Sequence, residues 1–251
     1  MIQYLAGVFD SEGYVRIRKT MNGKNYSYTY ECRLYMTNSK IVKLFAKKYG
    51  LTMKSDERGK HRKIAYYVTL NSKQLRETTF ISDLLPFLNE KREQLLQVKK
   101  LIEGVDKEVC YRAYMNAKLD FTHPVIGKPG PEYLAGIIDG DGWLSMFNAN
   151  KGTALYNKFS VGLQQRYKPM IEYMTRFGGS NVHTCKVYDK QSHVQTYSWQ
   201  ATTSSILPFL ESIYPFLIEK KEKCLILMNC IQVYEEFRDR SEELLQLWQE
   251  K

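Results

Sequence analysis

The stretches "YLAGVFDSEG" at residues 4–13 and "YLAGIIDGDG" at residues 133–142 are nearly the same ten letters, present twice in a chain of 251 residues. Each copy has an apolar turn with small residues, two acidic residues separated by one position, and a closing glycine. A second match, "PFLNEKRE" at 86–93 and "PFLIEKKE" at 215–222, has the same offset of 129 residues. Two separate matches at one offset indicate a tandem duplication, so that one polypeptide forms a pseudo-twofold dimer.

Both copies predict the same order of elements, beginning with a short helix over the decapeptide. In the first copy we expect strands at 13–20 and 26–38, a helix at 39–50, a hairpin at 51–70 with its turn near 58–60, and a long helix from Pro86. The second copy predicts the same elements at 142–149, 155–165, 169–179, 181–201 and from Pro215. Extra packing helices are expected at 105–118 and 241–251.

The fold class that follows is α+β, with two tandem αββαββα repeats at residues 1–118 and 133–251. Residues 119–132 carry three prolines and two glycines and are predicted to form the linker. Each repeat is expected to contribute an antiparallel sheet, and the two sheets are related by the pseudo-twofold axis at the paired motif helices.

The composition is that of a soluble globular protein, because 43% apolar residues are ample for a packed core. No apolar run approaches the roughly 20 residues of a membrane span, and no secretory signal is recognisable. The five cysteines are odd in number and widely spaced, which argues against a disulfide framework. We therefore expect an intracellular protein; a mitochondrion, a chloroplast and the cytoplasm of a bacterium or phage-infected cell are not distinguished.

Positive charge is concentrated in one half of the chain. The whole sequence has a net charge of +10, and residues 1–118 hold 23 Lys and Arg against 12 Asp and Glu, whereas residues 119–251 hold 14 against 15. A basic surface attracts polyanions such as nucleic acids. The alternative is that the lysines only solvate exposed helices.

Small residues in the decapeptide predict how the two copies meet. Ala6 and Gly7 in one copy, and Ala135 and Gly136 in the other, would let two helix backbones approach closely. Side-by-side packing on the pseudo-twofold axis would bring both helix ends together near residues 13 and 142.

Such an arrangement collects Asp10, Glu12, Asp139 and Asp141 at two helix C-termini, which already carry partial negative charge. Carboxylates held so close repel one another unless a cation neutralises them. Hard divalent cations prefer oxygen ligands, and Mg²⁺ completes its shell with waters and phosphate oxygens. The motif therefore predicts a metal site that accepts a phosphate, with a simple helix-ending turn as the alternative.

The two nonapeptides resemble the signature of the LAGLIDADG homing endonucleases, in the single-chain, two-motif form, and the resemblance covers nearly the whole chain. It implies that the eighth motif position, Glu12 and Asp141, holds the catalytic metal. Lys91 and Lys220 would lie beside the scissile phosphate, with exposed helix charges as the alternative. Asn38 and Gln165, aligned at an offset of 127, would join the water network of the site, or alternatively cap a helix or end a strand. The sixth-position acids, Asp10 and Asp139, would hold the helix ends and the following strand.

The resemblance further implies a monomeric, site-specific endonuclease that cuts both strands of duplex DNA and leaves short 3′ overhangs. Mg²⁺ is the expected cofactor, Mn²⁺ is expected to substitute for it, and Ca²⁺ is expected to support binding without cleavage. Two alternatives use the same scaffold: a maturase that binds its host intron RNA, and a non-cleaving DNA-binding regulator.

Period-two alternation along the strands selects the side chains that would read DNA, because alternate residues face opposite sides of a sheet. In the first copy Ile64, Tyr66 and Val68 are expected to be core residues. The outward, DNA-facing set in the first copy is Arg16, Arg18, Thr20, Thr29, Glu31, Arg33, Tyr35, Lys63, Ala65 and Tyr67. In the second copy it is Ser145, Phe147, Tyr156, Lys158, Ser160, Gly162, Thr196, Ser198 and Gln200. The second set is almost uncharged, so the first half is predicted to supply most of the phosphate attraction.

Overall fold

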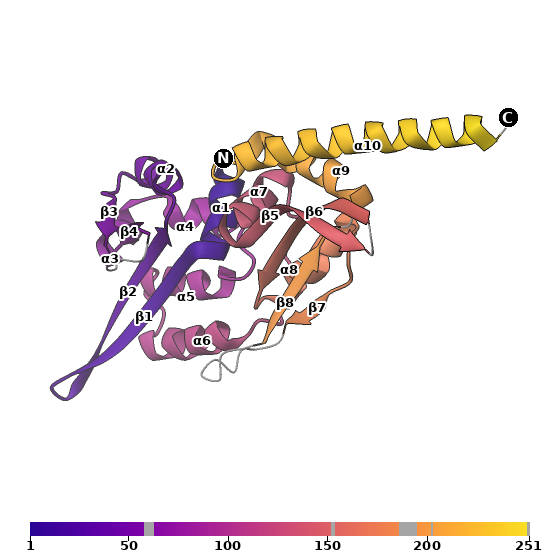
Figure 1. Ribbon diagram of the computed structural model, residues 1–251. Coiled ribbons are helices and arrows are strands. Elements are labelled where there is room, and N and C mark those ends of the chain that lie inside the picture. The colour runs from indigo at the N-terminus through magenta and orange to yellow at the C-terminus, as the bar shows by residue number, and fades with distance from the viewer. Residues whose placement is uncertain (58–62, 152–153, 186–194, 202, 250–251) are drawn as a thin grey trace.

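The structure is a computed structural model that describes residues 1–57, 63–151, 154–185, 195–201 and 203–249. For residues 147–151, 154–157, 203 and 238–249 it describes the backbone only. Within this part of the chain, each repeat contains one four-stranded antiparallel sheet, in the orders β1-β2-β4-β3 and β5-β6-β8-β7. The predicted α+β class and its duplicated order are confirmed (Figure 1).

The first repeat comprises six helices and four strands among the described residues. They are α1 (Ile2–Glu12), β1 (Gly13–Asn22), β2 (Asn25–Met36), α2 (Ser39–Tyr49), β3 (Lys54–Asp56), β4 (Ala65–Leu70), α3 (Ser72–Glu77), α4 (Phe80–Leu84), α5 (Arg92–Ile102) and α6 (Lys107–Leu119). The predicted hairpin turn at 58–60 lies outside the described residues.

The second repeat follows the same plan. Its elements are α7 (Pro131–Asp141), β5 (Gly142–Lys151), β6 (Ala154–Gln165), α8 (Lys168–Met174), the 3-10 turn η1 (Thr175–Phe177), β7 (His183–Cys185), β8 (Thr196–Gln200), α9 (Thr203–Ile213), the 3-10 turn η2 (Tyr214–Phe216) and α10 (Lys221–Gln249). Gly13 pairs with Leu34 and Gly142 with Leu163, so the offset of 129 residues extends into the sheet register.

The last helix of each repeat begins later than predicted. Neither Pro86 nor Pro215 starts a long helix: α5 begins at Arg92 and α10 at Lys221. The short helices α3, α4 and α9 precede these turns and were not predicted. Both helices begin late because the motif aspartates Asp10 and Asp139 bind the backbone amides of the preceding turns.

The core is built mainly on the sheet face away from solvent. In β1 and β2, Val15, Ile17, Cys32 and Leu34 are buried, as the alternation predicted. The hairpin prediction was wrong at two places in the first repeat. Ile64 is 43% exposed because it precedes β4, and Ala65 is buried.

The two repeats differ in how they end. After α5 the chain turns at Gly104, whose φ of 87° places it in the left-handed region, and Asp106 then caps α6 by accepting from the Val109 N–H at 2.9 Å. Helix α6 packs under the β1–β2 hairpin, where the Tyr114 hydroxyl donates to the Val15 carbonyl at 3.0 Å. Helix α10 instead continues straight and projects beyond the second repeat (Figure 1). Among the described helices none is both long and apolar enough to cross a membrane.

Candidate active site

Helices α1 and α7 lie side by side at the centre of the molecule (Figure 1). A Cβ atom placed on Gly7 would lie 2.1 Å from the Tyr133 carbonyl oxygen, and one on Gly136 would lie 2.2 Å from the Tyr4 carbonyl oxygen. The two backbones are therefore in direct contact, and only glycine fits at either position. Ala6 and Ala135 are fully buried beside them. The predicted packing of the motif helices is confirmed.

Each motif aspartate is bonded to a tyrosine of the other repeat. The Tyr4 hydroxyl donates to Asp139 Oδ2 at 2.7 Å, and the Tyr133 hydroxyl donates to Asp10 Oδ2 at 2.6 Å. All four side chains are buried. Because buried polar groups need partners, these crossed bonds tie the two repeats together at the pseudo-twofold axis.

The same aspartates hold the turns that precede α5 and α10. Asp10 accepts from the backbone N–H of Asn89 at 2.6 Å and of Lys91 at 2.8 Å. Asp139 does the same in the second repeat, accepting from Ile218 at 2.7 Å, Glu219 at 3.2 Å and Lys220 at 2.9 Å. These acids were predicted to hold the following strand. That prediction was wrong, because their carboxylate oxygens accept from backbone amides of the turns that precede α5 and α10. These bonds keep residues 89–91 and 218–220 out of the helix.

Each turn delivers a lysine to the C-terminus of a motif helix. The Lys91 ammonium donates to the Asp10 carbonyl, and the Lys220 ammonium donates to the carbonyls of Ile138 at 2.7 Å and Asp139 at 2.6 Å. Cations are favoured there because the last carbonyls of a helix carry partial negative charge. Burial lowers the pKa of Lys220, although the surrounding carboxylates oppose the shift.

Glu12 and Asp141 end the two motif helices at the same place. A Cβ atom on Gly140 would lie 3.3 Å from Glu12 Cγ, so the helix tips touch. Burial raises the pKa of Glu12 to about 7, and the charge of Asp141 adds to the shift, while Lys91 and Lys220 act in the opposite direction. The structure thus brings both predicted metal ligands and both predicted lysines into one electrostatic cluster.

The second repeat gives its motif acid a polar partner. Gln165 Nε2 donates to Asp141 Oδ2 at 2.8 Å, and the Gln165 side chain is buried. The pairing of Gln165 with Asn38 at an offset of 127 was wrong. In the sheet register Gln165 corresponds to Met36, which is buried, and Asn38 lies two residues further along the chain.

Asn38 has a different role. Its side-chain oxygen accepts from the N–H groups of Lys40 at 2.9 Å and Ile41 at 3.2 Å, which makes it the N-cap of α2. Asn, Asp and Ser are preferred at this position because they satisfy the first free amides of a helix. The alternative of a helix cap is the one that the structure bears out for Asn38.

Three charged residues of the site were missed from sequence. Glu90 and Glu219 precede the two lysines in the turns, and burial raises the pKa of both. Arg166 is exposed and lines a hollow of about 380 Å³ together with Glu90, Asp141 and Gln165. The repeated "NEK" and "IEK" triplets contained the signal for the two glutamates.

The outer face of the first sheet has the composition that was predicted. Arg18, Thr20 and Thr29 are exposed, while Arg16 lies 3.7 Å from Glu31 in an ion pair. Tyr35 stacks on Tyr67 at a centroid distance of 6.1 Å, and the Arg33 guanidinium lies 5.2 Å above the Tyr67 ring. Lys63 is exposed. Tyr14 was not predicted to belong to this face, but it is 37% exposed and lies two residues before Arg16 on β1.

The second sheet departs from its prediction at two described residues, Ser160 and Gly162, which are both buried. Ser160 is buried, because it bonds to Trp143 Nε1 at 3.3 Å and to Gln200 Nε2 at 2.7 Å. A Cβ on Gly162 would lie 2.2 Å from the Trp143 ring, so this indole covers the middle of the outer face. Ser145, Thr196, Ser198 and Gln200 are partly exposed and Lys158 is exposed. The side chains of Phe147 and Tyr156 lie outside the described residues.

The donor set of the site fits a hard divalent cation. Within the described part of the chain no group of three or more His, Cys, Asp and Glu side chains could hold a metal, and the carboxylates at the tips of the two motif helices are those of Glu12 and Asp141. Mg²⁺ is commonly bound by one or two carboxylates, with waters and substrate phosphates as its other ligands. Burial is the main cause of the raised pKa of Glu12 and the charge of Asp141 adds to it, so both disfavour a charged carboxylate at this position.

The fold and the site together define a class of protein: two fused repeats whose motif helices pack on a pseudo-twofold axis and end in paired acids. No family model matches the chain, and no curated protein matches it. Several solved structures, however, match the chain over nearly its whole length. That of I-SmaMI bound to an uncleaved DNA target in the presence of calcium ions has a TM-score of 0.70 and 16% identity, covering 95% of this chain and 92% of that one.

A second I-SmaMI structure, described as a LAGLIDADG homing endonuclease bound to cleaved DNA, has a TM-score of 0.68 and 16% identity over 98% of this chain and 93% of its own. The LAGLIDADG meganuclease I-CpaMI bound to uncleaved DNA has a TM-score of 0.67 and 14% identity over 98% and 96%. The protein described here therefore has the fold of the single-chain LAGLIDADG homing endonucleases.

Proposed function

We propose that the chain is a monomeric, site-specific homing endonuclease that hydrolyses both strands of a long duplex DNA target with divalent metal. The observation that carries the proposal is the meeting of Glu12 and Asp141 at the tips of α1 and α7, with Lys91 and Lys220 beside them. The likeness of the fold to structures of DNA-bound endonucleases supports it. None of the described features favours RNA as the ligand.

Glu12 and Asp141 would hold Mg²⁺ by one carboxylate each, and Gln165 would keep the Asp141 carboxylate oriented through its hydrogen bond of 2.8 Å. A bound divalent cation supplies the positive charge that activates the attacking water and stabilises the leaving 3′ oxygen. The protein groups would fix the scissile phosphates between the two acids.

Lys220 can contribute directly to the transition state. An ammonium has three donors, and Lys220 uses two of them on the carbonyls of Ile138 and Asp139. The third can donate to a phosphate oxygen or to the attacking water. Lys91 occupies the corresponding position for the other strand. Fixed donors of this kind stabilise charge that develops on phosphate oxygens.

Recognition of the target would use the outer faces of the two sheets. The guanidinium groups of Arg16, Arg18 and Arg33 suit the guanine edge in the major groove, and Glu31 can accept from cytosine. Polar side chains of β5, β6 and β8 would read the second half of the target.

The test is cleavage of a randomised duplex library in Mg²⁺, with sequencing of the cut ends. We expect one long preferred sequence and short 3′ overhangs. Glu12→Gln and Asp141→Asn should each lower cleavage by about 10³-fold or more, because a lost metal ligand removes several kcal/mol of transition-state stabilisation. Both variants should still bind the selected DNA in Ca²⁺.

Glu211→Gln is the matched control, since Glu211 is an exposed acid on α9 and is not one of the charges that shift the pKa of Glu12. It should cleave at the rate of the unaltered protein. Full cleavage by either motif variant, or the absence of any enriched target sequence, would contradict the proposal.

A further inference from the structure

The octapeptides at 86–93 and 215–222, which repeat at the offset of 129 residues, differ at two positions. At the first of them the turn before the last helix has Asn89 in the first repeat and Ile218 in the second. Both residues donate their backbone N–H to a motif aspartate. An asparagine side chain also accepts and donates hydrogen bonds, whereas that of isoleucine does neither. The first turn can therefore bond through this side chain to a further part of the protein, and the second cannot.

The partner of Asn89 is the connecting segment, residues 120–130, which joins α6 to α7. The Ile126 N–H donates to Asn89 Oδ1 at 2.7 Å, and His123 Nε2 donates to the Asn89 carbonyl oxygen at 2.9 Å. Because a carbonyl oxygen only accepts, Nε2 must carry the proton in this bond. Asn89 is 1% exposed, whereas Ile218 is partly exposed. The connecting segment thus holds the first lysine turn in addition to the motif aspartate.

His123 is itself held by the second repeat. Its ring stacks on that of Tyr167 with the ring centroids 4.8 Å apart, and its carbonyl oxygen accepts from the Tyr167 hydroxyl at 2.9 Å. Tyr167 is 1% exposed. An imidazole packed on a buried aromatic ring has little rotamer freedom, so its Nε2 stays directed at the Asn89 carbonyl oxygen.

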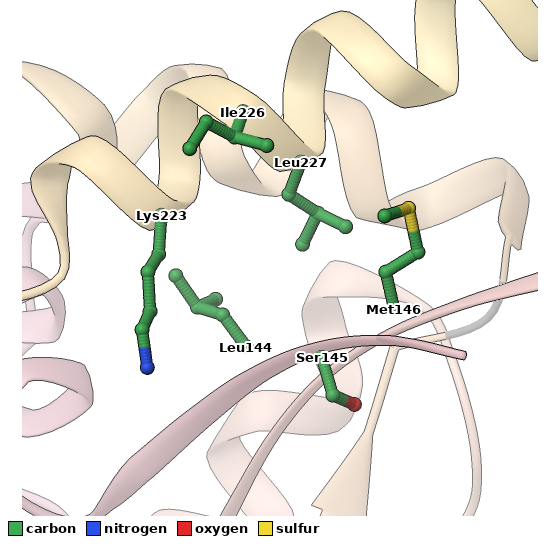
Figure 2. A pocket seen from close by; sticks show the side chains of 6 residues that line it. All are labelled: Leu144, Ser145, Met146, Lys223, Ile226 and Leu227. Atoms are coloured by element: carbon green, nitrogen blue, oxygen red, sulfur yellow. The ribbon is translucent and has the colours of Figure 1, made fainter.

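The second repeat has one continuous helix, α10, at the positions that α5 and α6 occupy in the first. This helix packs on β5: Leu144 and Met146 point toward it, and Leu227 points back toward them (Figure 2). Leu227 is 4% exposed. Beyond this contact α10 projects past the second repeat (Figure 1), so within the described residues it does not return to the turn at 218–220.

We propose that His123 is a positioning residue for Lys91: through the Asn89 carbonyl it fixes the turn that carries this lysine, and it thereby sets the rate at which one of the two DNA strands is cut. The inference rests on the proposed endonuclease function. Lys91 follows Asn89 by two residues, and its ammonium donates to the Asp10 carbonyl. A donor that is already fixed stabilises developing charge without reorganising during the reaction. The turn of Lys220 does not contact His123, so the effect is confined to one strand.

The first test needs neither DNA nor metal. Hydrogen exchange of the full chain, followed by mass spectrometry of peptic peptides, compares the amides of residues 89–91 with those of residues 218–220. His123→Ala should speed exchange at 89–91 by about 5- to 10-fold, because that is the equilibrium factor of a typical lost hydrogen bond. Exchange at 218–220 should stay the same. Unchanged exchange at 89–91, or an equal increase at both turns, would overturn the proposal.

The second test measures cleavage of each strand of an end-labelled target duplex. His123→Ala should slow the strand that Lys91→Met slows, by about 5- to 10-fold, and leave the strand that Lys220→Met slows unchanged. His123→Gln should restore the rate, because a glutamine amide nitrogen can take the place of Nε2. His123→Asn should not, since its amide nitrogen corresponds to Nδ1. Equal slowing of both strands, or equal rescue by both amides, would contradict the positioning role.

Tyr173→Phe is the matched control. The Tyr173 hydroxyl also donates to the connecting segment, at the Pro129 carbonyl and 3.1 Å, but not to the residue that reaches the lysine turn. This variant should change neither the exchange at 89–91 nor the rate on either strand. Unchanged melting temperatures would show that the variants are folded. If the unaltered protein cut no duplex, the endonuclease function would fail, while the exchange measurement would still decide whether His123 fixes the turn.

Discussion

The first repeat has Met36 where the second has Gln165, although the sequences of the two motif helices are nearly identical. Gln165 donates to Asp141, whereas the buried thioether of Met36 offers Glu12 no comparable donor. Glu12 is one methylene longer, and burial raises its pKa to about 7. The symmetric parts of the site are the backbone contacts and the turns, and the asymmetric parts are the side chains that surround Glu12 and Asp141.

The residues that pack the two motif helices are the same in both repeats, whereas the residues around Glu12 and Asp141 differ. Neither Gly7 nor Gly136 can be replaced by a larger residue, because each leaves room for the backbone of the other motif helix. The last residue of the second strand bonds to the motif acid of its own repeat in the second half, and its counterpart Met36 has no such donor, so this position is free to differ. The two strands of DNA would therefore be cut by unequal half-sites.

The largest expected effect concerns the symmetric part. Gly136→Ala and Gly7→Ala should each lower the free energy of unfolding by about 3 kcal/mol or more, since a Cβ would overlap a backbone oxygen of the partner helix. Urea denaturation measures both. Gly130→Ala is the control, because the one atom near its Cβ would be the terminal Oε1 of the Gln3 side chain, at 3.2 Å. A loss at one glycine but not at the other would contradict the symmetric packing.

The next effect concerns the asymmetric part. Gln165→Leu should slow cleavage of one strand by about 10- to 100-fold, because hydrogen bonds to charged groups are worth about 1.5–3 kcal/mol. Nicked plasmid should then accumulate. Met36→Leu is the matched variant, conserves volume, and should leave both rates unchanged. Equal slowing of both strands by Gln165→Leu would show that the amide serves a shared function.

A smaller effect should appear in stability without metal. The pKa of Glu12 is raised above its ordinary 4.5, so the folded state binds the proton more tightly, and stability is lost as pH rises from about 4.5 to about 7. Glu12→Gln should therefore stabilise the metal-free protein at pH 8 by on the order of 1–2 kcal/mol, and much less at pH 5. Melting temperatures in the presence of a chelator measure this. A Glu12→Gln variant that melts lower at pH 8 would argue against crowded carboxylates.

The smallest effect separates the outer faces of the two sheets. Replacing Lys24, Lys54 and Lys63, three exposed lysines in or beside the strands of the first sheet, with Gln should reduce the slope of log binding constant against log salt by about 2 to 3, since each lost phosphate contact removes about 1. Lys158→Gln in the second sheet should reduce it by about 1. Fluorescence anisotropy in Ca²⁺ measures both slopes. Equal changes would show that phosphate attraction is shared between the repeats.

The sequence predicted the features that repeat and the features that alternate. The offset of 129 residues located both motif helices and both lysines, and the period of two placed Val15 and Ile17 in the core with Arg16 and Arg18 outside. These patterns are local in the chain, and the sheet and helix geometry follow from them directly.

Features that depend on long-range partners were not predictable in the same way. Pro86 looked like a helix start because nothing in the local sequence reveals that Asp10 will bind the amides of Asn89 and Lys91. Asn38 was aligned with Gln165 because both are polar, and only the strand register shows that Met36 is the counterpart. Ser160 looked outward because the Trp143 ring that covers it comes from a neighbouring strand.

The crossed bonds between Tyr4 and Asp139, and between Tyr133 and Asp10, have a consequence for engineering. In a chimaera that joins one half of this protein to a half of another protein, each of these bonds would take its tyrosine from one parent and its aspartate from the other. Grafts that keep a tyrosine and an aspartate at these positions should assemble, and those that lose either would leave a buried carboxylate or hydroxyl without its mate. Compatibility of the halves is therefore set by two tyrosine hydroxyls at the contact of α1 and α7, and not by the two β-sheets.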